Sequence, residues 1–378
     1  MAPPVDIIAA LSASLKQAST QALDISFNEL LDMASSGELN ITPEYQRLFR
    51  WSEGQRSRFI ESLLLEMPVP PIFVIEEAAG TYQLIDGLQR ISSYLHLRGK
   101  LDAPHLDPPI KVGDMLTLSD CDIVHALNGF GYDDLPSSLQ IRLKRAFIRM
   151  EVIRKETDPR FKYHMFKRLN TGGEILSDQQ VRNAAIRMLS SEFPDFLIQL
   201  SKYTKFKLCT TYLTQERRLS AFDQELILRF FALKNVRNRF KHEVSDFLTD
   251  YMEKIADPLE NEPFDYDNEQ AAFQKTFRVL AESLGEYAFS FANKAKTALS
   301  GGFSIYHFEA ITIGLQPVLQ NLDASNKAQM ESLAAKLREI KLDPQFVRIT
   351  TGGGRNSPGP LNTRINFVAD RLRNAFNG

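Results

Sequence analysis

Residues 82–97 read YQLIDGLQRISSYLHL, and this stretch predicts a strand that turns through a glycine into a helix. Residues 82–86 alternate apolar and polar side chains and include an aromatic and a β-branched residue, which is typical of a short strand. Gly87 interrupts the alternation, and Ile91 and Leu95 then follow at helical spacing. We therefore expect a strand–turn–helix element with GLQR at its turn.

The start of this helix is suited to binding an anion. Backbone N–H groups at a helix start point outwards, and the positive end of the helix dipole lies among them. Arg90 in the first turn can bind a phosphate with two hydrogen bonds, and Asp86 can hold a metal ion or a water beside it. The alternative is that Gly87 only makes the turn, while Asp86 caps the helix and pairs with Arg90. These residues alone leave both interpretations open.

Composition indicates a globular protein with more than one domain. The chain has 378 residues, with 43% hydrophobic and 24% charged residues, which allows two or three domains. No apolar run is long enough for a membrane helix, and the N-terminus does not resemble a signal peptide, so we expect no membrane association. Two cysteines, Cys121 and Cys209, are far apart, which favours neither disulfides nor zinc. We expect a reducing, cytoplasmic setting.

Charge is distributed unevenly along the chain, although the net charge is only −2. Residues 142–168 contain ten Lys or Arg and three acidic residues, whereas residues 243–269 contain ten acidic residues and one Lys. The basic segment is a candidate contact for DNA. The alternative is that it forms the solvated side of a helix.

A second candidate segment is ITPEYQRLFRW, at residues 41–51. Pro43 disfavours helical backbone at the residue before it, so we expect an extended loop. This loop would present Tyr45, Gln46 and Arg47, together with a second arginine and an indole. The alternative is that its aromatic side chains only cover the rim of a core.

The remaining pattern predicts an α+β domain followed by a helical one. We expect two helices in residues 6–36, a helix capped by Ser52, strands at 72–75, 82–86 and 147–153, and helices capped by Asp158 and Ser177. From residue 184 to about 343 the apolar spacing is helical, and its stripes, which include Phe230 and Phe277, are typical of a core. The predicted domains are residues 1–183 and 184–378.

Three segments together resemble the motifs of the N-terminal domain of GmrSD-type restriction endonucleases. They are PEYQRLFRW, LIDGLQR and FKRLNTGGEILSDQQVRNA, and they follow the order of the family signature P-x-Y-Q-R…W, D-G-Q-Q-R and F-x-R-x-N…G-x-x-L-S. That family belongs to the wider ParB/sulfiredoxin-like group, in which a GxxR turn after a strand binds nucleotide phosphates. The resemblance covers roughly residues 25–190 and implies a ParB/sulfiredoxin-like N-terminal domain. Leu88 stands where the family has a glutamine, and the cysteine of sulfiredoxin is absent.

The resemblance implies a nucleotide-binding, NTP-hydrolysing regulatory component of an antiphage or restriction-type defence system. An NTP and Mg²⁺ are the expected ligands. The residues expected to bind the nucleotide are Tyr45, Gln46, Arg47, Gly87, Leu88, Gln89, Arg90, Arg168 and Asn170. The residues expected to act in catalysis are Asp86, Glu61 and Arg90, of which Asp86 and Glu61 are also the expected Mg²⁺ ligands.

Two other function classes stay open. One is a Mg²⁺-dependent DNA nuclease or nickase, and the other is a non-catalytic DNA-binding adaptor switched by nucleotide. A separate nuclease or toxin subunit is an expected partner of the helical half. An HNH nuclease centre is not predicted, because only His242 and His307 follow residue 170 and they are far apart. The triplet Glu339, Ile340 and Lys341 imitates part of another nuclease motif but lies in a helical pattern.

Overall fold

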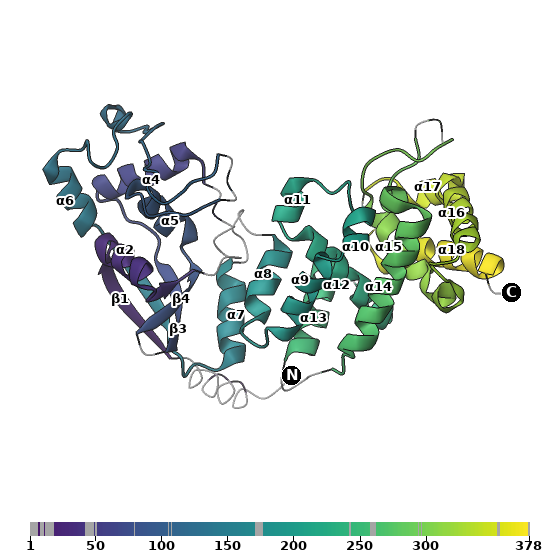
Figure 1. The fold of residues 1–378 in the computed structure, drawn as a ribbon. Coiled ribbons are helices and arrows are strands. Elements are labelled where there is room, and N and C mark those ends of the chain that lie inside the picture. The colour runs from purple at the N-terminus through teal and green to yellow at the C-terminus, as the bar shows by residue number, and fades with distance from the viewer. Residues whose placement is uncertain are drawn as a thin grey trace. The chain divides into compact units, whose positions relative to one another are not determined.

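A computed structural model divides the chain into two compact units, Met1–Leu176 and Ser177–Gly378 (Figure 1). The residues that the structure describes are 7, 11, 19–41, 49, 51–78, 80–104, 106, 108–170, 177–241, 243–257, 262–293, 295, 297–353 and 356–376. The unit boundary precedes the one we predicted after residue 183, because the helix that begins at Asp178 makes its polar contacts with the second unit.

The first unit is built on a mixed five-stranded sheet in the order β1-β5-β3-β4-β2. The strands are β1 (Thr20–Ser26), β2 (Leu39–Asn40), β3 (Ile72–Ala78), β4 (Thr81–Asp86) and β5 (Phe147–Ile153). β1 with β5 and β3 with β4 are antiparallel, while β3 with β5 and β2 with β4 are parallel. The strands predicted from apolar and polar alternation are therefore confirmed.

One prediction for the sheet was wrong. We expected two helices in residues 6–36, but Thr20–Ser26 form β1, which pairs with β5 along its whole length. This segment has no complete helical stripe, and β5 supplies hydrogen-bond partners for its backbone, so the non-local pairing outweighs local preference. Ser26 is nevertheless the N-cap that we predicted, since its hydroxyl accepts a hydrogen bond from Glu29 N at 3.1 Å.

Helices cover the sheet and complete the core of this unit. They are α2 (Phe27–Ser36), α4 (Glu53–Leu64), α5 (Leu88–Leu97), the 3₁₀ helix η1 (His125–Leu127), α6 (Ser137–Arg145) and α7 (Pro159–Asn170). α4 packs on both α5 and α6, and α7 packs beside β4 (Figure 1). The predicted caps are confirmed at Ser52, where a full capping box forms, and at Asp158, which accepts from two amides of α7. The GLQR turn thus lies where β4 ends and α5 enters the core.

The second unit is helical, as predicted. Its elements are α8 (Asp178–Ile186), α9 (Glu192–Ser201), α10 (Thr204–Cys209), α11 (Gln215–Leu219), α12 (Phe222–Val236), η2 (Arg237–Arg239), α13 (Val244–Ala256), α14 (Tyr266–Ser283), η3 (Gly285–Phe289), α15 (Ile305–Gly314), η4 (Gln316–Asn321), α16 (Lys327–Leu342), α17 (Pro344–Thr350) and α18 (Pro358–Phe376). Phe230 and Phe277 of the predicted stripes are fully buried core residues. In the described part of the chain, no helix is both long enough and apolar enough to cross a bilayer.

Candidate functional site

Gly87 is the N-cap of α5 and is required there by geometry. Its φ of 110° lies in the left-handed region, and a Cβ at this position would lie 2.3 Å from Ile72 Cγ2 in β3. Any other residue would therefore be strained and would also displace β3. Because glycine has no side chain, the N-cap residue cannot accept hydrogen bonds from the first amides of the helix. This start of α5 therefore has the character of an anion site.

Arg90 projects from the first turn of α5 and holds the ends of two strands together. Its Nη2 donates to Asp86 Oδ2 at 2.7 Å and to the carbonyl oxygen of Pro71 at 3.0 Å. The pairing that we considered as an alternative is therefore present in the ligand-free protein, although Asp86 is not the helix cap. The Nε of Arg90 is buried and has no hydrogen-bond partner among the described residues. An unmade bond of this kind is costly unless another group completes it.

Leu88 and Gln89 differ in what their side chains contact. Leu88 is 4% exposed and packs in the core of the first unit, so the substitution of the family's glutamine adds core packing at this position. Gln89 is also buried, and its Oε1 accepts a hydrogen bond from Trp51 N at 3.1 Å. The turn of the second motif is therefore bonded directly to the last residue of the first motif.

A buried polar cluster behind this contact was not predicted from the sequence. Arg56 Nε donates to the carbonyl oxygen of Trp51 at 2.9 Å, and Arg56 Nη1 donates to His96 Nδ1 at 2.8 Å. The guanidinium also lies over the Phe49 ring, 5.3 Å from its centroid. Burial, followed by the positive charge of Arg56, lowers the pKa of His96 to about 4. No local pattern links these residues, because they meet only when α4 packs on α5.

The low pKa of His96 predicts a loss of stability in acid. Between pH 6.5, its ordinary pKa, and about 4, the unfolded chain binds a proton that the folded chain does not. The contribution of neutral His96 to the free energy of unfolding is therefore fully present above pH 6.5. It decreases as the pH falls towards 4, by up to about 3 kcal/mol. Urea unfolding followed by the fluorescence of the single Trp measures this change in the first unit. His96→Asn keeps an acceptor at the Nδ1 position, and its stability should depend less on pH. Equal pH dependence in both proteins would contradict the assignment.

Glu61 has a structural role that its sequence context did not reveal. It is 1% exposed, and its Oε1 accepts hydrogen bonds from Ile123 N at 3.1 Å and from Val124 N at 2.5 Å. Asp86, the other expected metal ligand, instead pairs with Arg90. Among the residues described, no group of three or more His, Cys, Asp or Glu is arranged to hold a metal ion. Glu61 is thus engaged by backbone amides and Asp86 by Arg90.

The remaining predicted site residues are placed only in part. Tyr45, Gln46 and Arg47 lie outside the described residues. Arg168 is exposed near the end of α7, the helix beside β4. Asn170 is the last residue of α7, and its side chain lies outside what the structure describes. The structure thus brings together the turn of the second motif and the end of the first.

The basic segment at residues 142–168 does not form one continuous patch. Its arginines are divided among α6, β5, the loop that follows β5 and α7, and three of them are in ion pairs with described residues. These pairs are Arg142 with Glu66, Arg149 with Asp24 and Glu151, and Arg154 with Glu76. Lys144 and Arg145 are exposed at the end of α6 without an ion pair to a described residue. The unpaired positive charge is therefore smaller than the sequence suggested.

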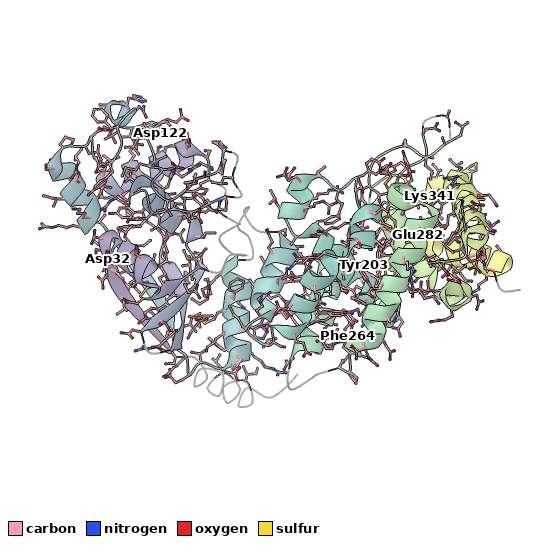
Figure 2. All side chains as sticks on the ribbon, viewed as in Figure 1. Asp32, Asp122, Tyr203, Phe264, Glu282 and Lys341 are labelled. Atoms are coloured by element: carbon pink, nitrogen blue, oxygen red, sulfur yellow. The ribbon has the colours of Figure 1, made fainter. Side chains whose placement is uncertain are left out.

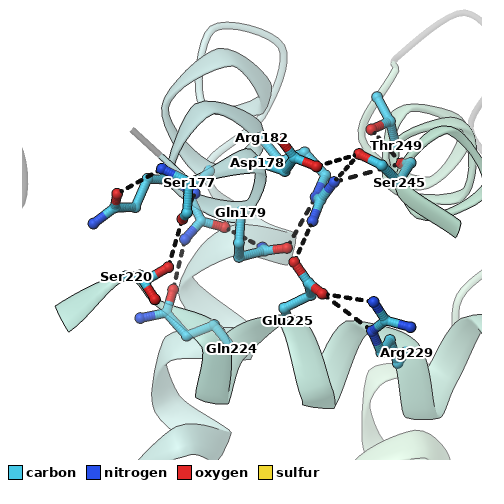
Figure 3. A network of polar contacts seen from close by, with 12 residues as sticks. Ser177, Asp178, Gln179, Arg182, Ser220, Gln224, Glu225, Arg229, Ser245 and Thr249 are labelled. Atoms are coloured by element: carbon cyan, nitrogen blue, oxygen red, sulfur yellow. Dashed lines mark hydrogen bonds and ion pairs between the residues drawn. The ribbon is translucent and has the colours of Figure 1, made fainter. Parts of the chain in front are cut away.

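The end of the third motif belongs to the second unit. Ser177 and Gln180 form the predicted capping box of α8, and Gln180 Nε2 also donates to the carbonyl oxygen of Leu219. Arg182 is 4% exposed and donates to Glu225 Oε2 at 2.8 Å and to Ser245 Oγ at 3.1 Å (Figure 3). The residues of S-D-Q-Q-V-R, 177–182, thus anchor α8 to α12 and α13.

Ion pairs continue from this anchor through the second unit. Glu225 also pairs with Arg229 at 2.8 Å (Figure 3). Arg229 pairs with Glu309 at 2.9 Å. Glu309 in turn pairs with Arg364 of α18. Arg182, Glu309 and Arg364 are buried and the other two charges are nearly so, and each therefore depends on its neighbours for compensation.

The nuclease-like triplet is also structural. Lys341 is fully buried among the helices of the second unit (Figure 2), where its Nζ donates to the carbonyl oxygen of Ala288 at 2.9 Å. Glu339 is exposed and pairs with Lys336 on the same helix. His307 is buried and has Thr350 Oγ1 3.2 Å from its Nε2, while His242 lies outside the described residues. These side chains do not form a shared nuclease centre in the described structure.

Comparison with known proteins supports the resemblance of the motifs. Residues 27–187 match the family model described as "GmrSD restriction endonuclease, N-terminal domain". A search of curated proteins and a search of solved structures each found no match. The match contains the whole GLQR turn, the cluster behind it and α8, and the family takes its name from restriction enzymes of defence systems. This part of the chain belongs to the GmrSD restriction endonuclease N-terminal domain family.

Proposed function

We propose that the first unit binds a nucleoside triphosphate at the GLQR turn, as a regulatory part of a restriction-type defence protein. The observation that carries this proposal is the start of α5. Gly87 leaves its first amides without an N-cap side chain, and Arg90 beside them has a buried Nε that lacks a partner. Amides, a helix dipole and a guanidinium at one point are a binding site for phosphate. A ParB/sulfiredoxin-like arrangement of the fold is part of the same proposal.

In the proposed binding step, Arg90 releases the Asp86 carboxylate and binds phosphate instead. In the free protein its Nη2 is bonded to the Asp86 carboxylate at 2.7 Å. A triphosphate carries more negative charge than a carboxylate and offers several acceptor oxygens, so it competes well for the same guanidinium. Once released, the Asp86 carboxylate is available to Mg²⁺, which neutralises phosphate charge when it is bound. Asp86 is therefore both the internal competitor for Arg90 and the proposed cation ligand.

This exchange predicts opposite effects of one substitution under two conditions. Asp86→Asn removes the competing charge, and the Asp86 side chain is partly exposed, so its ion pair is worth no more than about 1 kcal/mol. Without Mg²⁺, the variant should bind triphosphate about threefold more tightly than the wild type. With Mg²⁺, the gain should disappear, because the proposed cation ligand is lost. Calorimetric titration in EDTA and in Mg²⁺ tests both, and weaker binding of the variant in EDTA would contradict the exchange.

The proposed function itself is tested by binding and turnover. The full chain is titrated with ATP, GTP, CTP and UTP, and phosphate release is measured with and without DNA. Saturable binding of at least one triphosphate is expected. Phosphate release would extend the proposal to hydrolysis, with Asp86 positioning water and Arg90 stabilising the charge that develops on phosphate. Absence of binding to all four would refute the proposal.

A nuclease or a DNA-binding adaptor switched by nucleotide is less well supported. The described residues lack a cluster of three metal-ligating side chains, and three arginines of the basic segment are already in ion pairs. Plasmid cleavage that depends on Mg²⁺ and is lost in Asp86→Ala would favour the nuclease. Salt-dependent DNA affinity reduced by Lys144→Ala or Arg145→Ala would favour the adaptor.

A further inference from the structure

We propose that Gln89, Arg56 and His96 are positioning residues that hold Trp51, and with it the end of the first motif, against the phosphate-binding turn. This inference rests on the proposed function. It adds a link between the first and second motifs, which consists of the side-chain hydrogen bonds to Trp51. Gln89 follows Leu88 in the first turn of α5 and immediately precedes Arg90. The same short stretch of helix therefore carries both the guanidinium of the site and the side chain that holds Trp51.

The backbone N–H and C=O of Trp51 are both hydrogen-bonded to side chains rather than to the backbone of a helix or strand. Its N–H donates to Gln89 Oε1 at 3.1 Å, and its carbonyl oxygen accepts from Arg56 Nε at 2.9 Å. Its ring packs against Phe59, with 5.8 Å between centroids. Trp51 belongs to no helix or strand, so these two hydrogen bonds and the ring contact hold it in place beside α4 and α5.

Arg56 is itself held in place by α5. It is 6% exposed, its Nη1 donates to His96 Nδ1 at 2.8 Å, and its guanidinium lies over the Phe49 ring.

 Arg56 forms no ion pair with a described residue, and its Nε and Nη1 donate to neutral acceptors. Burial lowers the pKa of Arg56, and the negative charge of Glu53 opposes this only in part. Such an arrangement costs free energy, which a purely structural contact could avoid with an apolar side chain.

The link is tested in the full chain through its single Trp, which is Trp51. Gln89→Leu removes the acceptor of the Trp51 N–H and leaves the amides and Arg90 of the site unchanged. We expect its Trp emission maximum to shift to longer wavelength, and its triphosphate affinity to fall about tenfold. His96→Leu should act in the same direction through Arg56, whereas His96→Asn, which keeps an acceptor for Arg56, should restore both values.

Ser93→Ala is the matched control. Ser93 is fully buried in the same helix, and its hydroxyl donates to the carbonyl oxygen of Gln89 at 2.7 Å without contacting Trp51. Its emission maximum and affinity should remain those of the wild type. All variants are compared at a temperature where circular dichroism shows them folded, so that a change in affinity is not a change in folding.

The outcomes separate this inference from the proposed function. If the wild type binds triphosphate and Gln89→Leu changes neither emission nor affinity, the link is overturned while the proposed function stands. If the wild type binds none, the proposed function fails, and with it the claim that the link serves a phosphate site. A change in emission without any change in affinity would show that the contact is structural only, and would also overturn the inference.

Discussion

Arg90→Ala is expected to weaken triphosphate binding about a hundredfold. The substitution removes charge-assisted hydrogen bonds to phosphate, and it also frees Asp86, whose only ion pair in the described structure is with Arg90. An uncompensated carboxylate beside the start of α5 would then repel the incoming phosphates. The lost hydrogen bonds and the new repulsion therefore both weaken triphosphate binding. Calorimetric titration with the triphosphate that binds the wild type best measures the effect.

Two further variants make this result specific. Arg90→Ala combined with Asp86→Asn removes the repulsion, so part of the lost affinity should return. Arg149→Ala removes an arginine that is 57% exposed on β5 and paired only at the surface, and its affinity should match the wild type. If Arg90→Ala binds within twofold of the wild type, Arg90 is not part of a phosphate site.

The second large effect is expected at Arg182 and concerns stability. Arg182→Met leaves Glu225 with one arginine instead of two, and leaves Gln179 Oε1 without its present donor inside the second unit. Removing one partner of a buried ion pair typically costs about 3 kcal/mol or more. We therefore expect the urea midpoint of the second unit to fall clearly, with no loss of triphosphate affinity under conditions where the protein is folded.

Two optical signals distinguish the units in this experiment. Trp51 lies in the first unit, whereas far-ultraviolet circular dichroism arises largely from the many helices of the second. Arg182→Met should shift the circular dichroism transition and leave the Trp transition nearly unchanged. Glu339→Gln, which removes an exposed ion pair of α16, is the control and should change stability by less than about 0.5 kcal/mol. If the circular dichroism transition of Arg182→Met is unchanged, the ion-pair network contributes little to the stability of the second unit.

Local sequence determined most of the secondary structure and the position of the candidate site. Capping residues such as Ser52 and Asp158 identified helix starts, because the hydrogen bonds they accept involve amides two or three residues away. The alternation of β4, followed by Gly87, identified the turn for the same reason. The family motifs identified the domain, which the matched family model confirms over residues 27–187.

Tertiary structure decided which of these residues contact one another. β1 forms because β5 is available to pair with it, and Glu61 is a buried anchor because a distant loop presents two amides to it. Two hydrogen bonds depend on the packing of α4 against α5: the one from Trp51 N to Gln89, and the one from Arg56 to His96. Local hydrogen bonds and side-chain periodicity can be read within a few residues of the chain, but buried polar contacts depend on the fold that brings their partners together.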